Sequence, residues 1–277
     1  MMIRMPQLQR VGEPVTAPIS AQAQSLLTAH LQRVDQLWTR MDIVVLNHPA
    51  ETSEVLNDRK DPLRAYAHDL AMLATRTALD HLRAWQTLFT SGEIPVYAHF
   101  SLLRSAHESA LFAYWLSEPG LDRDERRRRG IAGQVADLDE RRKIEEAIGR
   151  TEATPGKLAA KRLEDLMDKA TELGLTTKNK NGKTILAPGT PSVVELFDRY
   201  EAAPPEVKAS YLYRLYSGYT HGKQWALMQG AQPQTPFDSS GRTLAVATSS
   251  EDVAAHATRR VVDAVERAIV NQEELRR

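Results

Sequence analysis

The feature that most constrains the fold is the segment from Val96 to Leu116, whose side chains are apolar almost all the way round a helix. Such a helix has no side suited to water, so other elements must enclose it. The rest of the chain offers mainly amphipathic helices for that purpose. The sequence therefore predicts an all-α fold, a helical bundle with a charged helical insertion and at most a small β-hairpin.

Helix caps and helix breakers divide the chain. Ser20 can cap a helix that reaches about Asn47, and Asp61 followed by Pro62 begins a second helix that stops at Gly92. The apolar stripe expected on this second helix contains Leu63, Tyr66, Leu70, Leu73, Thr77, His81, Trp85 and Leu88. Further helices are expected over 95–118, 122–150, 154–173 and 204–221, from Ser192, and from 251 to the C-terminus, with a loop over 48–60.

The domain organisation follows from local composition. Residues 1–18 lack an apolar core and are interpreted as a flexible arm, with docking on a partner subunit as the alternative. Residues 19–277 are expected to form one helical domain, in which the polar section at about 122–190 is an insertion or a projecting arm. Within that section, Asn181 and Gly182 predict the turn of a small hairpin.

Overall charge and cysteine content exclude several classes of protein. Lys plus Arg and Asp plus Glu both total 36, so a strongly basic nucleic-acid binder is not indicated, although a local basic patch is compatible with these totals. The chain contains no cysteine, which excludes disulfides, thiol nucleophiles and zinc–cysteine sites. No apolar run reaches the roughly 18 residues of a membrane span. We therefore expect a cytoplasmic protein that does not enter the membrane.

The first polar cluster lies on the buried helix and consists of Arg104, His107 and Glu108. These groups need partners, because burying a lone charge is costly. Arg104 and Glu108 stand one turn apart and can pair along the helix. The cluster is either a structural ion pair that fixes helix register or a set of supporting groups for a functional site.

The second polar cluster contains Arg214, Ser217 and His221 on one face of a later helix. In a continuous helix Arg214 and His221 differ by only about 20° around the axis and by about 10 Å along it. Gly218 could bend the helix and bring them closer. The tyrosines of this segment either pack the helix or stack on bases; they are Tyr211, Tyr213, Tyr216 and Tyr219.

An Arg and a His that share a pocket suit phosphate chemistry. The guanidinium binds a phosphate and stabilises its developing charge, and the imidazole transfers a proton near neutral pH. Together they suffice for metal-free RNA cleavage by the 2′-hydroxyl. No HExxH or Glu-x-x-His motif provides a metal site, so no metal and no cofactor are expected. A site formed by His81, His107, Glu108 and His221 is the metal-binding alternative.

Several basic or aromatic positions are candidate RNA contacts. The run Arg126–Arg129 is either a solvated helix face or a phosphate-contacting strip. Three lysines of the polar section would help such a strip: Lys178, Lys180 and Lys183. Tyr219 and Lys223 are the candidates beside the second polar cluster.

The spacing Arg214-LYSGYT-His221, late in an all-α chain, resembles the final-helix signature of the HEPN superfamily. The segments LLRSAHESALFAYWL and YRLYSGYTHG look similar to an uncharacterised bacterial branch related to abortive-infection proteins. The resemblance covers roughly residues 20–230, with the polar section as an insertion. It implies an all-α fold, Arg214 and His221 as the catalytic residues, and a homodimer in which two such motifs face each other.

Two main functions follow from these observations. One is a metal-independent endoribonuclease of a defence or stress-response type, in which Arg and His cleave RNA. The other is a non-catalytic HEPN-like helical module that binds a protein, such as an antitoxin, or a nucleotide ligand. A structural protein of a phage or mobile element and a metal-dependent enzyme are the remaining alternatives.

Overall fold

The computed structural model describes residues 20–92, 95–150, 158–229, 231–233, 245–247 and 251–277 of the chain. The predicted flexible arm at 1–18 lies outside the described residues. The all-α class is confirmed, because helices account for nearly all of the regular structure in the described part. No helix in these ranges is both long enough and apolar enough to cross a bilayer.

The helices run in the following order: α1 (Ala21–Leu46), α2 (Glu54–Asp58), α3 (Pro62–Ser91), α4 (Ala98–Leu116), α5 (Arg123–Ala147), α6 (Ala159–Glu172), α7 (Val193–Tyr200), α8 (Tyr211–Thr220), α9 (Gln224–Gln229) and α10 (Glu251–Leu275). The short strands are β1 (Thr176–Lys178), β2 (Thr184–Leu186), β3 (Ala231–Pro233) and β4 (Ala245–Ala247).

Local capping signals set several of these boundaries. The Ser20 hydroxyl accepts a hydrogen bond from the Ala23 amide at 3.1 Å and begins α1. Asp61 caps α3, and Gly92 ends it in the left-handed conformation with φ +77°. Ser192 forms the predicted capping box at the start of α7. These boundaries agree with the sequence because caps depend on a few neighbouring residues.

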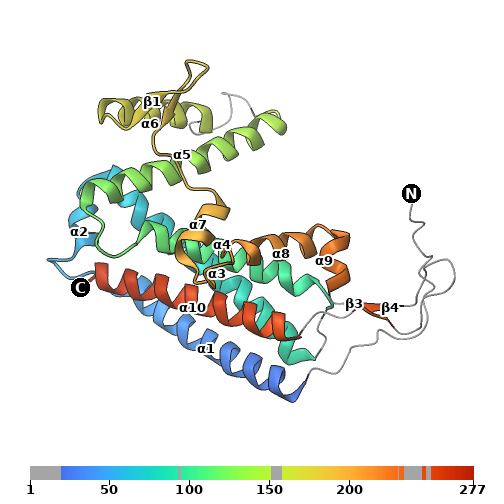
Figure 1. The fold of residues 1–277 in the computed structure, drawn as a ribbon. Coiled ribbons are helices and arrows are strands. Elements are labelled where there is room, and N and C mark those ends of the chain that lie inside the picture. Colours follow the sequence, from blue (N-terminus) through green and yellow to red (C-terminus); the bar gives the residue numbers. More distant parts are fainter. Residues whose placement is uncertain (1–19, 93–94, 151–157, 230, 234–244, 248–250) are drawn as a thin grey trace.

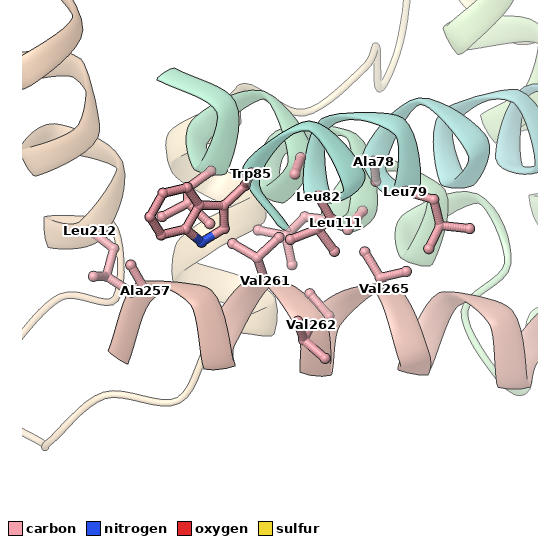
Figure 2. Packing of buried hydrophobic residues seen from close by; sticks show 14 of the residues in the cluster. Ala78, Leu79, Leu82, Trp85, Leu111, Leu212, Ala257, Val261, Val262 and Val265 are labelled. Carbon is pink, nitrogen blue, oxygen red and sulfur yellow. The ribbon is translucent and has the colours of Figure 1, made fainter. Parts of the chain in front are cut away.

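The main bundle consists of α1, α3, α4 and α10 (Figure 1), with α4 buried as predicted. α10 packs against α1 and α4, and α3 packs along α4. Their shared core includes Leu82, Trp85, Leu111 and Val261, which Figure 2 shows meeting between α3, α4 and α10. Burial of each large apolar side chain contributes about 1.5–3 kcal/mol to stability.

The stripe predicted for α3 is partly wrong. Trp85 is buried, and Leu70 and Leu88 pack against the core, but the stripe missed the alanines that the helix buries. Leu73 is 63% exposed, whereas Ala67, Ala71 and Ala78 are fully buried. Small side chains allow α4, α5 and α10 to approach α3 closely. Side-chain size, and not only hydrophobicity, therefore decides which face of α3 is buried.

The predicted insertion begins as part of the main bundle and ends as a separate layer. The first half of α5 crosses α3 so closely that a Cβ on Gly130 would lie 2.6 Å from the Ala67 amide nitrogen. From Ile131 onward, α5 packs with α6 around a small core that contains Ile131, Leu138 and Leu166. In Figure 1, α6 and the β1–β2 hairpin lie on the side of α5 that faces away from the main bundle.

The hairpin at Asn181-Gly182 is confirmed, with β1 antiparallel to β2 and Thr177 opposite Ile185. β3 and β4 also pair in antiparallel fashion, with Gln232 opposite Val246. That second ladder was not predicted as a pair. The expected loop over 48–60 contains α2, which Ser53 caps.

The helix expected from Pro204 is wrong at its start, since α8 begins only at Tyr211. The amide of Ser210 donates to the Asp198 carboxylate at 2.8 Å, and this bond holds a turn ahead of α8. The same hydrogen bond is the main reason why the pKa of Asp198 is lowered. A long-range contact, absent from local sequence signals, therefore sets the start of α8.

Candidate functional site

The surface where the end of α8 meets α4 carries most of the predicted site residues. α8 packs against α4, and the Ser101 hydroxyl of α4 lies 3.1 Å from the Thr220 hydroxyl at the last turn of α8. Gly222 follows with φ +60°, a conformation that favours glycine, and it turns the chain into α9. This turn leaves His221 exposed at the corner.

Arg104 is the centre of this surface cluster. Its Nε donates to Glu108 Oε1 at 2.6 Å, which confirms the predicted pairing along α4. Its Nη2 lies 3.4 Å from the Tyr213 hydroxyl, and the guanidinium carbon lies 5.1 Å from the centre of the Tyr213 ring. The side chain is 21% exposed, so one part of the cation stays accessible.

The imidazole of His221 meets Arg104 directly. Nη1 of Arg104 lies 3.3 Å from His221 Nε2. A guanidinium can only donate, so His221 accepts through Nε2 and a neutral ring carries its proton on Nδ1. We call Arg104, Glu108, Tyr213 and His221 the α4–α8 cluster.

Arg214 is exposed on the same helix as His221 but does not enter the α4–α8 cluster. Within the described residues its side chain makes no hydrogen bond, and its charge adds to the lowering of the Asp198 pKa. α8 remains helical through Gly218, so the bend that would bring Arg214 towards His221 does not occur. Ser217 is half-buried, and its carbonyl accepts the His221 amide at 3.0 Å.

His107 faces away from the α4–α8 cluster, into the interior. It is fully buried, and its Nε2 lies 3.3 Å from Glu201 Oε1 in a geometry that does not make a hydrogen bond. Burial would raise the pKa of Glu201, but His107 and Arg267 outweigh this effect and keep it lowered. The first polar cluster is therefore divided, with His107 in the interior beside Glu201 and with Arg104 and Glu108 at the surface.

The tyrosines of α8 also separate into two groups. Tyr219 is 4% exposed and stacks on Phe100, with ring centres 4.3 Å apart. Other side chains therefore cover the ring of Tyr219, so the predicted RNA contact at this residue is not supported. Tyr216 is fully buried, and burial strongly raises the pKa of its hydroxyl. Tyr213 is the tyrosine that contacts Arg104.

The two ends of the basic run Arg126–Arg129 are buried, so they form neither a solvated face nor a phosphate-contacting strip. Arg127 and Arg128 are half-buried and pair with acidic residues of α5. Arg126 is 1% exposed and pairs with Glu54 and Asp58. Arg129 is 4% exposed and lies 2.6 Å from Glu118. Carboxylates from α2, from α5 and from Glu118 in the segment between α4 and α5 thus neutralise these cations.

The three lysines of the hairpin are exposed but do not join the α4–α8 cluster. Lys178 and Lys183 belong to the β1–β2 region, which Figure 1 places well away from α8, and Lys180 lies in the turn between the strands. A cavity of about 340 Å³ lies between α5, α6 and β2. Its lining is mostly apolar and includes Val135, Met167 and Lys183.

Lys223 is exposed directly after His221 and Gly222, as the candidate RNA contact requires. Sequence reasoning named Tyr213 only as one of four tyrosines of this segment, and it missed the exposed Trp225 of α9. Trp225 carries a recognisable signal, since an indole close to Lys and His in a polar stretch is unusual for a core residue.

The metal site proposed as an alternative is not formed. Within the described ranges, no three His, Asp or Glu side chains come together in a way that could hold a metal ion. His107 is buried beside Glu201, whereas His221 is exposed beside Arg104. Comparisons with protein-family models, with curated proteins and with solved structures found no significant match to this chain.

Proposed function

We propose that the chain is a metal-independent endoribonuclease whose reaction takes place at the α4–α8 cluster. The observation that supports the proposal best is the contact of 3.3 Å between the guanidinium of Arg104 and the imidazole of His221 at an exposed corner. One group suits a phosphate and the other suits proton transfer. The HEPN-like spacing agrees with this assignment for His221 but not for Arg214, which lies outside the cluster, and the resemblance implies a defence or stress-response role.

The proposed reaction needs only these side chains and the RNA itself. His221 takes the proton of the 2′-hydroxyl, whose oxygen attacks the adjacent phosphorus. Arg104 turns from the imidazole to the phosphate and stabilises the charge that develops there. The P–O5′ bond breaks, and the proton passes from the imidazolium to the 5′-oxygen. The products are a 2′,3′-cyclic phosphate and a 5′-hydroxyl.

The first test is cleavage of single-stranded RNA in the presence of EDTA. His221→Ala should lower the rate about 10²- to 10⁴-fold, because proton transfer is lost. His48→Ala is the matched control, since His48 is also exposed but lies between α1 and α2. Cleavage by His221→Ala at the wild-type rate would refute the proposal.

The two arginines can be separated by the same assay. Arg104→Ala should lower the rate about 10²-fold, because it removes the group that stabilises the developing charge. Arg214→Ala should have this effect only if Arg214 reaches the phosphate. If Arg104→Ala kept full activity and Arg214→Ala lost it, the phosphate would be bound at Arg214 and not at the α4–α8 cluster.

A homodimer is the proposed way for Arg214 to take part. Within one chain Arg214 is exposed and stays outside the α4–α8 cluster, so a second subunit would have to bring it to a phosphate held by His221. Light scattering should then report a dimer. Mixing inactive Arg214→Ala with inactive His221→Ala should restore part of the activity, and a monomer would exclude this arrangement.

The second candidate is a non-catalytic module that binds a protein or nucleotide ligand. It is favoured by Glu108, which partly neutralises Arg104 at 2.6 Å and so weakens its attraction for phosphate. In this case nucleotides should raise the melting temperature while no RNA is cleaved. Glu108→Gln should then strengthen nucleotide binding, and a nucleotide-independent melting temperature would count against this candidate.

A further inference from the structure

The exposure of Trp225 sets it apart from the other tryptophans of the chain. Trp85 and Trp115 are 1% and 2% exposed and belong to the main core, and Trp38 is partly buried against it. Trp225 is 51% exposed on α9. A single exposed apolar side chain is ordinary and does not by itself indicate a binding site, so the position of Trp225 relative to its neighbours is what matters.

The position of Trp225 is fixed by Gly218. A Cβ at Gly218 would lie 2.8 Å from Cζ2 and 3.0 Å from Cη2 of Trp225, so the indole rests where α8 lacks a side chain. Gly218 follows Arg214 by one turn and precedes His221 by about one turn, on the same side of the helix. The indole therefore lies on the face of α8 that carries both predicted catalytic residues.

The surroundings of the indole are polar and basic. All residues from Thr220 to Trp225 are exposed, and this stretch includes His221 and Lys223 but no acidic residue. Cations that contact phosphates, next to an aromatic ring that contacts bases, are typical of surfaces for single-stranded nucleic acids. A protein partner could also cover the ring, but the stretch from Thr220 to Trp225 carries Lys223 and no carboxylate, and the nearby Glu108 is paired with Arg104, which favours a polyanion.

We propose that Trp225 stacks on an unpaired base of the RNA whose phosphate occupies the α4–α8 cluster, so that the substrate is single-stranded. The inference rests on the proposed function and names the residue that would bind a base of the substrate. Every base has an aromatic face, so the ring would bind single strands with little sequence preference. A duplex would bind more weakly, because its bases are already stacked on one another.

Binding is tested with single-stranded DNA of mixed sequence, which lacks the 2′-hydroxyl and so cannot be cleaved by this mechanism. Titration of the full chain should quench tryptophan fluorescence, and the quenching should be lost in Trp225→Phe but kept in Trp38→Phe. Trp225→Ala should weaken binding about tenfold, whereas Trp225→Phe should keep most of the affinity. The same sequence as a duplex should bind more weakly. Melting temperatures show whether each variant is folded.

The outcomes separate this inference from the proposed function. A folded Trp225→Ala variant with wild-type affinity for the single strand would overturn the inference, even if the protein cleaves RNA. Equal affinity for the duplex would also overturn it. A changed oligomeric state in Trp225→Ala, with unchanged DNA binding, would identify a protein interface instead. Trp225-dependent binding without RNA cleavage would uphold the inference and refute only the nuclease.

Discussion

Arginines of two regions of this protein lie in opposite environments. At the start of α5, Arg126 and Arg129 are buried and each meets two carboxylates. In the α4–α8 cluster, Arg104 meets the single carboxylate of Glu108 and stays partly exposed beside His221. The contrast shows that partners, and not the density of arginines, separate a structural network from a candidate phosphate site. Each prediction below tests this contrast.

The largest effect on stability is expected for Arg126→Ala. Asp58 is fully buried, and removal of Arg126 takes away one of the charges that compensate it. The free energy of unfolding should fall by about 3–5 kcal/mol, as for broken buried ion pairs. Urea denaturation measures the change. The control is Arg127→Ala, whose partner Asp124 is exposed and whose loss should cost less than about 1 kcal/mol.

The next largest effect is expected where α5 crosses α3. Gly130→Ala places a methyl group against the backbone of Ala67 and should lower the free energy of unfolding by about 1–3 kcal/mol. Gly133→Ala should cost less, because its nearest neighbour at 2.8 Å is the end of the flexible Leu70 side chain. Equal losses in the free energy of unfolding for the two variants would show that close contact at Gly130 does not determine how α5 packs on α3.

Acid should weaken the α5 network. A hydrogen bond from Arg128, outweighing burial, lowers the pKa of Glu125 from 4.5 to about 2. Since the folded pKa is lowered, this stabilisation is present above pH 4.5 and is lost as the pH falls towards about 2. Glu125→Gln should therefore cost about 1 kcal/mol near neutral pH, given the partial exposure of the pair. As the pH falls, the urea denaturation curves of Glu125→Gln and of the wild type should converge.

The smallest effect on stability is expected for Arg104→Ala. The Arg104–Glu108 pair is 21% and 28% exposed, so its loss should change the free energy of unfolding by less than about 1 kcal/mol. The same Arg-to-Ala change at Arg126 should cost several times more. A large loss of stability in Arg104→Ala would mean that the α4–α8 cluster is structural, as the sequence left open.

The sequence by itself determined the features that depend on neighbouring residues. The all-α class, the buried α4, the caps at Ser20, Asp61 and Ser192, and the hairpin at Gly182 all follow from local patterns. Arg104 and Glu108 pair as predicted because they stand one turn apart on one helix. Such contacts need no knowledge of the rest of the fold.

Only the tertiary structure decided which polar groups face water and which face each other. His107 lies one residue from Glu108, yet packing turns it towards Glu201 of another segment. His221 meets Arg104 from α4 instead of Arg214 from its own helix, because α8 is continuous between Arg214 and His221 and packs on α4. Helix crossings bring together residues far apart in sequence, and their angles depend on the sizes of many side chains at once.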